Sequence, residues 1–134
     1  MRKIAGRGRP VPSGSSRSAS SIYRDRDGIL KALRELAEAA LARHPDLVRV
    51  ILFGSLARGD YGLHSDADVL LVLARSSEER YFDRIPAFLP DFVAAPIPVE
   101  IFPYTEEELR RMERQENMFV RRMLREGQVM AERV

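Results

Sequence analysis

The alternation of apolar and polar positions predicts three strands in the middle of the chain. Residues 47–53 are rich in β-branched and aromatic side chains, and a glycine follows them directly. Residues 68–74 are apolar on both faces, which is typical of a strand in the centre of a sheet. A third strand is predicted over residues 99–104, after a linker that contains three prolines.

Helical periodicity precedes and follows these strands. Apolar residues recur every three or four positions over residues 27–43, where a His-Pro pair ends the pattern. A Ser-x-x-Glu capping box predicts a short helix within residues 76–88, and a Thr-x-x-Glu box predicts another within residues 105–115. Residues 117–125 are predicted to form the last helix, with Gly127 just beyond its end.

Strands that alternate with helices indicate an α/β (α+β) domain with a small mixed β-sheet and flanking helices. We expect this domain to span residues 24–134, about 110 ordered residues, which is enough for one modest core. Residues 1–23 contain glycines, prolines and serines and offer almost nothing to bury. We therefore expect a disordered tail there.

The charge of the chain is concentrated in that tail. The isoelectric point is about 9.3, but residues 1–23 hold five basic side chains and no acidic one. Residues 24–134 carry 17 basic and 20 acidic side chains, so the folded part is mildly acidic. A nucleic-acid-binding domain needs a basic surface, so we expect nucleic acid to be bound at most weakly, through the tail.

The absence of certain residues excludes several classes of protein. The sequence has no cysteine, which excludes disulfides, cysteine-ligated zinc and thiol catalysis. The longest apolar run, residues 69–74, has six residues and is far too short to span a membrane. We expect a cytoplasmic protein with no membrane association.

One segment carries candidate chemistry. The strand over residues 47–53 leads into Gly54-Ser55, and a tight turn there exposes backbone N–H groups and a hydroxyl that suit phosphate oxygens. Asp66 and Asp68 follow at the start of the next strand, where side chains two positions apart share a face. Paired carboxylates with no neutralising neighbour favour a hard cation, magnesium or manganese.

The flanking strands distinguish this segment from a second, similar sequence pattern in the chain. Gly14-Ser15 is followed by Asp25-Arg26-Asp27, but no strand precedes that string and a helix follows it. We interpret Asp25 and Asp27 as helix N-terminal charges. The alternative for the Asp66 and Asp68 pair is a coincidental turn with solvated acidic residues.

Two apolar strands that enclose Gly-Ser and a spaced Asp-x-Asp resemble the DNA polymerase β-type nucleotidyltransferase superfamily. The sequence Gly-Ser-Leu-Ala-Arg-Gly at residues 54–59 is similar to the corresponding motif of the minimal nucleotidyltransferases, the antitoxin-type partners of HEPN-domain proteins. The resemblance covers about residues 48–104 and implies a nucleotidyltransferase-like fold. It implies that Gly54 and Ser55 hold the phosphates of ATP or another nucleoside triphosphate. It also implies that Asp66 and Asp68 bind two Mg²⁺ ions, with Mn²⁺ as an alternative.

The family has a third carboxylate on a later strand, usually an aspartate. Glu100, between apolar neighbours, matches it by position but not by identity, and its alternative role is that of a solvent-facing strand residue. The resemblance implies that Glu100 completes the metal site and accepts a proton from the acceptor hydroxyl. Arg58 would bind the triphosphate by charge-assisted hydrogen bonds, or else form a surface ion pair with Asp60.

The resemblance implies transfer of AMP from ATP, with release of pyrophosphate, to an acceptor hydroxyl. Only 30 residues follow Tyr104, too few for an acceptor pocket, so we expect the acceptor on another macromolecule. The resemblance names a tyrosine of a HEPN-type toxin. We expect that toxin to dock on the C-terminal helices, where Arg110, Arg114, Arg121 and Arg125 would anchor it. Two alternatives stay open: a non-catalytic antitoxin that acts by binding, and an antibiotic-modifying nucleotidyltransferase. The second alternative requires an additional domain.

Overall fold

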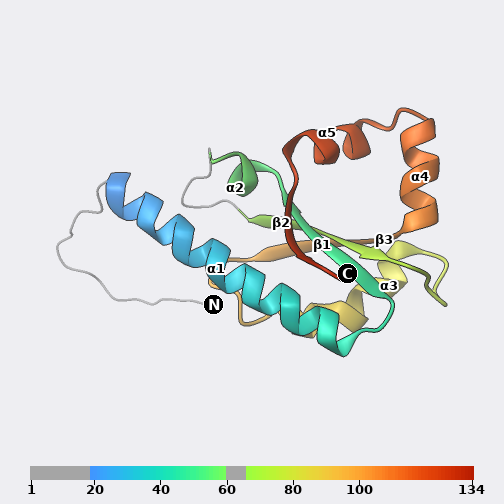
Figure 1. The fold of residues 1–134 in the computed structure, drawn as a ribbon, viewed down its shortest axis with the longest axis horizontal. Helices are drawn as coiled ribbons and strands as arrows, with labels where there is room; N and C mark the ends of the chain where they lie inside the picture. Colours follow the sequence, from blue (N-terminus) through green and yellow to red (C-terminus); the bar gives the residue numbers. More distant parts are fainter. Residues whose placement is uncertain (1–18, 60–65) are drawn as a thin grey trace.

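The computed structural model describes residues 19–59 and 66–134, and its four strands form one mixed sheet (Figure 1). The strands are β1 (Leu47–Phe53), β2 (Ala67–Leu73), β3 (Val99–Thr105) and β4 (Gln128–Glu132). Their order is β3-β2-β1-β4. β1 is antiparallel to both β2 and β4, whereas β2 and β3 are parallel. The predicted fold class is confirmed, and β2 lies inside the sheet as its apolar faces indicated.

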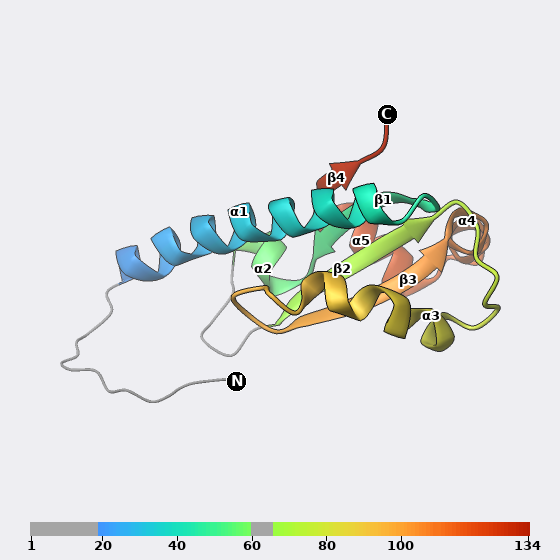
Figure 2. The ribbon, with the colours of Figure 1, turned by 90° about the horizontal axis from the view of Figure 1, so that it is seen from below.

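Helices cover both faces of this sheet (Figure 2). One face packs against α1 (Ala19–Arg43), α3 (Tyr81–Phe88) and the 3₁₀ helix η2 (Leu89–Phe92). The other face packs against α4 (Glu106–Arg114) and α5 (Met118–Glu126). A one-turn helix, α2 (Ser55–Arg58), follows β1 at the end of the sheet. Each strand contributes alternate residues to a core on either face of the sheet, because side chains along a strand alternate between faces.

The two cores differ in composition. The α1–α3 core is mostly aliphatic and includes Leu33, Leu52 and Leu71, all fully buried. The α4–α5 core is smaller and aromatic, with the rings of Phe53 and Phe119 in edge-to-face contact 5.4 Å apart. The aromatic core fixes α5 against the sheet, close to the carboxyl end of β1.

Helix α1 begins at Ala19, eight positions before the predicted start. Residues 19–23, which we assigned to a disordered tail, are therefore helical, and residues 1–18 lie outside the described part of the chain. Asp25 and Asp27 lie inside the helix and not at its N-terminus, so that interpretation was wrong. The cause is tertiary: Arg26 donates to the backbone carbonyls of Leu56 at 2.8 Å and Ala57 at 3.2 Å, which fixes this part of α1 against α2.

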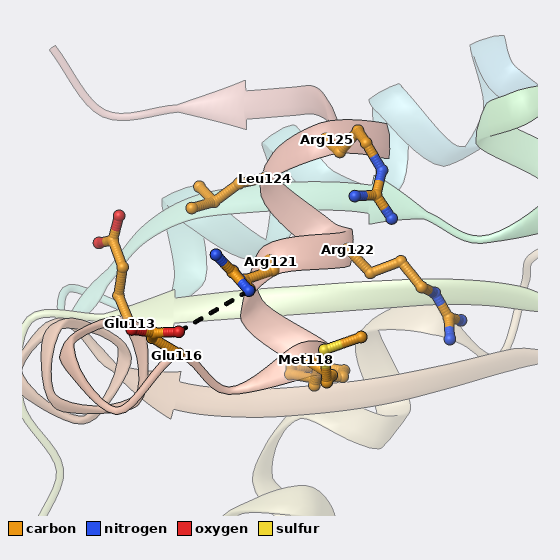
Figure 3. A pocket seen from close by; sticks show the side chains of 8 residues that line it. Glu113, Glu116, Met118, Arg121, Arg122, Leu124 and Arg125 are labelled. Carbon is orange, nitrogen blue, oxygen red and sulfur yellow. Dashed lines mark ion pairs between the residues drawn. The ribbon is translucent and has the colours of Figure 1, made fainter.

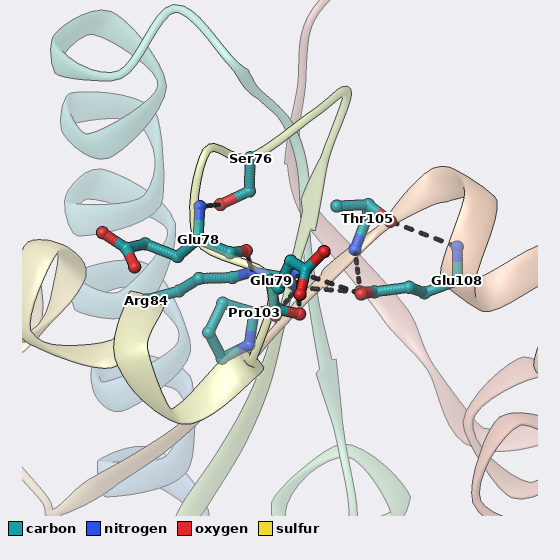
Figure 4. A network of polar contacts seen from close by, with 7 residues as sticks. All are labelled: Ser76, Glu78, Glu79, Arg84, Pro103, Thr105 and Glu108. Carbon is teal, nitrogen blue, oxygen red and sulfur yellow. Dashed lines mark hydrogen bonds and ion pairs between the residues drawn. The ribbon is translucent and has the colours of Figure 1, made fainter.

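Helix α3 begins at Tyr81, later than the predicted capping box. The hydroxyl of Ser76 accepts a hydrogen bond from the N–H of Glu78 in a local turn, and Arg84 binds the carbonyls of Glu78 and Glu79 (Figure 4). These carbonyls accept hydrogen bonds from a buried guanidinium, so the segment before Tyr81 stays non-helical. The capping box of α4 is formed as predicted.

The C-terminal segment contains two differences from the prediction. No element was predicted after Gly127, whereas residues 128–132 form edge strand β4. Gly127 itself is extended, with φ −67° and ψ 143°, because the chain passes directly from α5 into that strand. The helical spacing of Phe119, Met123 and Leu124 predicts that all three lie in the core. Met123 is buried and Phe119 packs against the core, but Leu124 is exposed.

Candidate active site

The register of the sheet brings two predicted site residues together. Asp68 on β2 pairs with Phe53 of β1 on one side and with Glu100 of β3 on the other. Strand alternation places both carboxylates on the face that carries Leu70 and Phe102, the face covered by α4 and α5. Glu100 therefore lies beside Asp68 and is exposed, which is compatible both with a third acidic residue of one site and with a solvent-facing strand residue.

Asp66 precedes β2 by one residue and is exposed, two positions from Asp68. Burial raises the pKa of Asp68, and the charges of Glu100 and then Asp66 raise it further, against the opposing effects of Arg122 and Arg58. Glu100 and Asp66 are thus close enough to repel the Asp68 carboxylate electrostatically. Burial and these two negative neighbours disfavour an uncompensated charge on Asp68, which favours a bound cation.

The donor set suits magnesium, which proteins commonly hold through one or two carboxylates together with substrate phosphates. Within residues 19–59 and 66–134, no three acidic or histidine side chains gather tightly enough to form a protein cage for a metal ion. A metal site made of carboxylates from β2 and β3 would therefore need further oxygen ligands, from water or from a bound molecule.

Gly54 lies directly against the Asp68 carboxylate. Its φ is +84°, a conformation that favours glycine, and a Cβ placed there would overlap Oδ2 of Asp68. Ser55 follows as the first residue of α2, whose single turn is closed by a 3.0 Å hydrogen bond from the N–H of Gly59 to the carbonyl of Ser55. The predicted Gly-Ser turn is formed, and its backbone approaches the Asp68 carboxylate so closely that a Cβ at Gly54 would not fit.

Arg58, the last residue of α2, donates to Glu126 of α5 at 3.0 Å. Nε of Arg122 lies 3.9 Å from the same carboxylate oxygen. The alternative partner of Arg58, Asp60, lies outside the described residues. Arg122 belongs to a run of arginines mixed with glutamates that predicts a solvated or partner-facing surface, and neither Arg122 nor Glu126 was among the predicted site residues. The local signal for an interaction between Arg122 and Glu126 was their four-residue spacing on one helix face, and such pairs are common on any helix.

A groove of about 1000 Å³ runs along α5 next to this site (Figure 3). Its lining is partly apolar, through Met118, Phe119 and Leu124, and otherwise charged. Met118 and Leu124 are largely exposed. None of the helices in the described part of the chain is both long and apolar enough to span a bilayer.

Comparison with known proteins agrees with this geometry. The family model of the nucleotidyltransferase domain matches residues 33–125, a range that contains all six predicted site residues. A solved structure of a Sulfolobus solfataricus protein, assigned as a nucleotidyltransferase, is 27% identical with a TM-score of 0.63. The alignment covers 90% of this chain and 94% of that one.

A crystal structure of a toxin–antitoxin with AMP-PNP shares the fold, with a TM-score of 0.55 and 18% identity over 75% of this chain and 73% of that one. No functionally curated protein matches the sequence. The family model spans most of the chain and the whole of the Gly-Ser and Asp-x-Asp region. The chain therefore belongs to the nucleotidyltransferase domain family and has its fold.

Proposed function

We propose that this protein transfers AMP from ATP to a hydroxyl of a partner protein, a tyrosine of a HEPN-type toxin, and so acts as its antitoxin. The observation that carries the proposal is the pairing of Asp68 with Glu100 beside the Gly54 turn, with Asp66 two positions before Asp68. Membership of the nucleotidyltransferase family supports the reaction class. Because ATP is the donor, we place the reaction in the cytoplasm.

Each site residue has a proposed role. Asp66, Asp68 and Glu100 would hold two Mg²⁺ ions, or Mn²⁺, which when bound neutralise charge on the reacting phosphate oxygens. The backbone at Gly54 and Ser55 would donate to the phosphates, and Arg58 would form charge-assisted hydrogen bonds with them.

The chemistry is an in-line displacement at the α-phosphorus. The acceptor oxygen forms a bond to that phosphorus, and the bond from the phosphorus to the bridging oxygen of pyrophosphate breaks. The hydroxyl proton passes to the carboxylate of Glu100, which reaches the site with a longer side chain than the usual aspartate. These residues act mainly by positioning the reactants and neutralising charge.

A macromolecular acceptor is supported by the surface next to the site. The α5 groove combines exposed apolar side chains with arginines, and arginines are frequent anchors in protein interfaces. The toxin–antitoxin structure of similar fold was solved with AMP-PNP, a nucleotide analogue. These observations favour a protein partner over a small drug-like acceptor.

The test supplies ATP, magnesium and a HEPN-type partner protein and measures the intact mass of that partner. We expect a mass increase equal to AMP with the wild-type protein and none with the Asp66→Asn, Asp68→Asn double variant. A complex without added mass would support the second candidate, a non-catalytic antitoxin, which the Glu100 departure from aspartate favours. Neither complex nor added mass would refute both proposals.

A further inference from the structure

We infer that Arg122 of α5 is a second phosphate-binding cation of the nucleotide site, beside Arg58. This inference rests on the proposed function, because it assigns a residue to the binding of the same nucleoside triphosphate. It extends the site from the strand ends and α2 to α5, an element more than fifty residues away in the sequence.

A single carboxylate connects the two arginines. Oε1 of Glu126 accepts a hydrogen bond from Nη1 of Arg58 at 3.0 Å and lies 3.9 Å from Nε of Arg122. The Glu126 side chain is only 12% exposed, whereas the Arg122 side chain is 56% exposed. The carboxylate is therefore anchored in the protein, and the Arg122 guanidinium next to it is open to a ligand.

The Glu126 carboxylate faces two guanidinium groups, those of Arg58 and Arg122, at the end of the sheet that carries α2. Both Arg58 and Arg122 also act on Asp68 by lowering its pKa, so both lie within electrostatic range of the carboxylates at this end of the sheet. A triphosphate that binds between the Gly54 turn and the carboxylates would meet these two cations. Guanidinium groups suit phosphate oxygens in geometry as well as in charge.

The side chains of Arg122 and its neighbour Arg121 point in different directions. Figure 3 shows Arg122 and Arg125 projecting to one side of α5, while Arg121 is directed toward Glu116. Nη1 of Arg121 lies 4.0 Å from Oε1 of Glu116, and its side chain is 57% exposed. Arg121 therefore matches Arg122 in residue type, helix and exposure but points elsewhere, which makes it a suitable control.

The experiment measures the dissociation constants of ATP and AMP, with magnesium present, for the wild type, Arg122→Gln and Arg121→Gln. We expect Arg122→Gln to weaken ATP binding about tenfold, because one charge-assisted hydrogen bond contributes about that factor. The loss should be smaller for AMP, which has less phosphate charge. Arg121→Gln should bind both nucleotides like the wild type, and Arg122→Lys should fall between Arg122→Gln and the wild type.

Each of the remaining outcomes would contradict either this inference or the proposed function. Unchanged ATP affinity in Arg122→Gln would refute the inference, as would equal losses for ATP and AMP. An equal loss in Arg121→Gln would mean that the effect is the general charge of α5 and not a specific contact. A wild-type protein that binds no ATP would instead refute the proposed function, and this inference with it.

Discussion

Gly54 occupies a position of the candidate site where a side chain does not fit. Its φ of +84° disfavours any side chain, and an added Cβ would overlap the Asp68 carboxylate. We expect Gly54→Ala to lose about 1–3 kcal/mol of unfolding free energy from backbone strain. Because Asp68 must also move, we expect the variant to lose magnesium-dependent ATP binding, measured by titration calorimetry, while it retains a cooperative thermal transition.

Gly59 provides a matched control for that substitution. Its φ is +88°, but nothing in the described structure lies within 4 Å of the position of an added Cβ. Gly59→Ala should therefore show a similar loss of stability and normal ATP binding. If Gly54→Ala bound ATP as well as Gly59→Ala does, the phosphates would lie away from the Gly54 turn.

At the scale of elements, one buried arginine joins α3, β3 and α4. Arg84 donates to the carbonyl of Pro103 at 3.0 Å and to both carboxylate oxygens of Glu108 at 2.7 and 2.9 Å (Figure 4). We expect Glu108→Gln to lower the unfolding free energy by about 2 kcal/mol, because it leaves a buried guanidinium without its counter-charge. Chemical denaturation measures this loss. Glutamine can still serve in the capping box of α4, so the loss reports mainly on the charge.

The pH dependence of this loss follows from the lowered pKa of Glu108, whose first cause is the hydrogen bond from Arg84. A carboxyl with a lowered folded-state pKa stabilises the fold fully above its ordinary value of 4.5. That contribution declines as pH falls below 4.5 through the folded-state pKa, so wild type and Glu108→Gln should converge in stability in acid. The exposed Arg80–Asp83 pair is the control: Asp83→Asn should cost less than about 0.5 kcal/mol. A pH-independent difference for Glu108→Gln would contradict this account.

At the scale of the whole molecule, β4 connects the C-terminal segment to the rest of the domain. Met130 on β4 is buried in the α1–α3 core, and Arg133 donates to the carbonyls of Leu41 and Leu47, both at 2.8 Å. We expect Met130→Ala to lower the unfolding free energy by about 2–4 kcal/mol, as for other buried truncations, measured by urea denaturation.

The neighbouring Val129 is exposed, so Val129→Ala should cost less than about 1 kcal/mol. Equal small losses for both variants would show that β4 unfolds separately from the rest of the sheet. This strand borders β1, which leads directly into the Gly54 turn, so its attachment also supports the candidate site.

The sequence by itself determined those features that depend on neighbouring residues. Residues 47–53 form a strand with the predicted bounds, and the Thr105–Glu108 capping box opens α4. The Gly54 turn could also be predicted, because a glycine between a strand and a helical turn is a local signal. Alternation along a strand also predicted one shared face for Asp66 and Asp68, although Asp66 precedes β2 by one residue.

Only the tertiary structure decided which distant residues meet. The parallel pairing of β2 with β3 places Glu100 beside Asp68, and the packing of α5 brings Arg122 and Glu126 to Arg58. The Ser76 capping box failed because Arg84 binds the carbonyls of that segment and links them to a residue in α4. Short-range patterns carry no information about such contacts, because their free energy comes from burial and charge pairing between segments far apart in the chain.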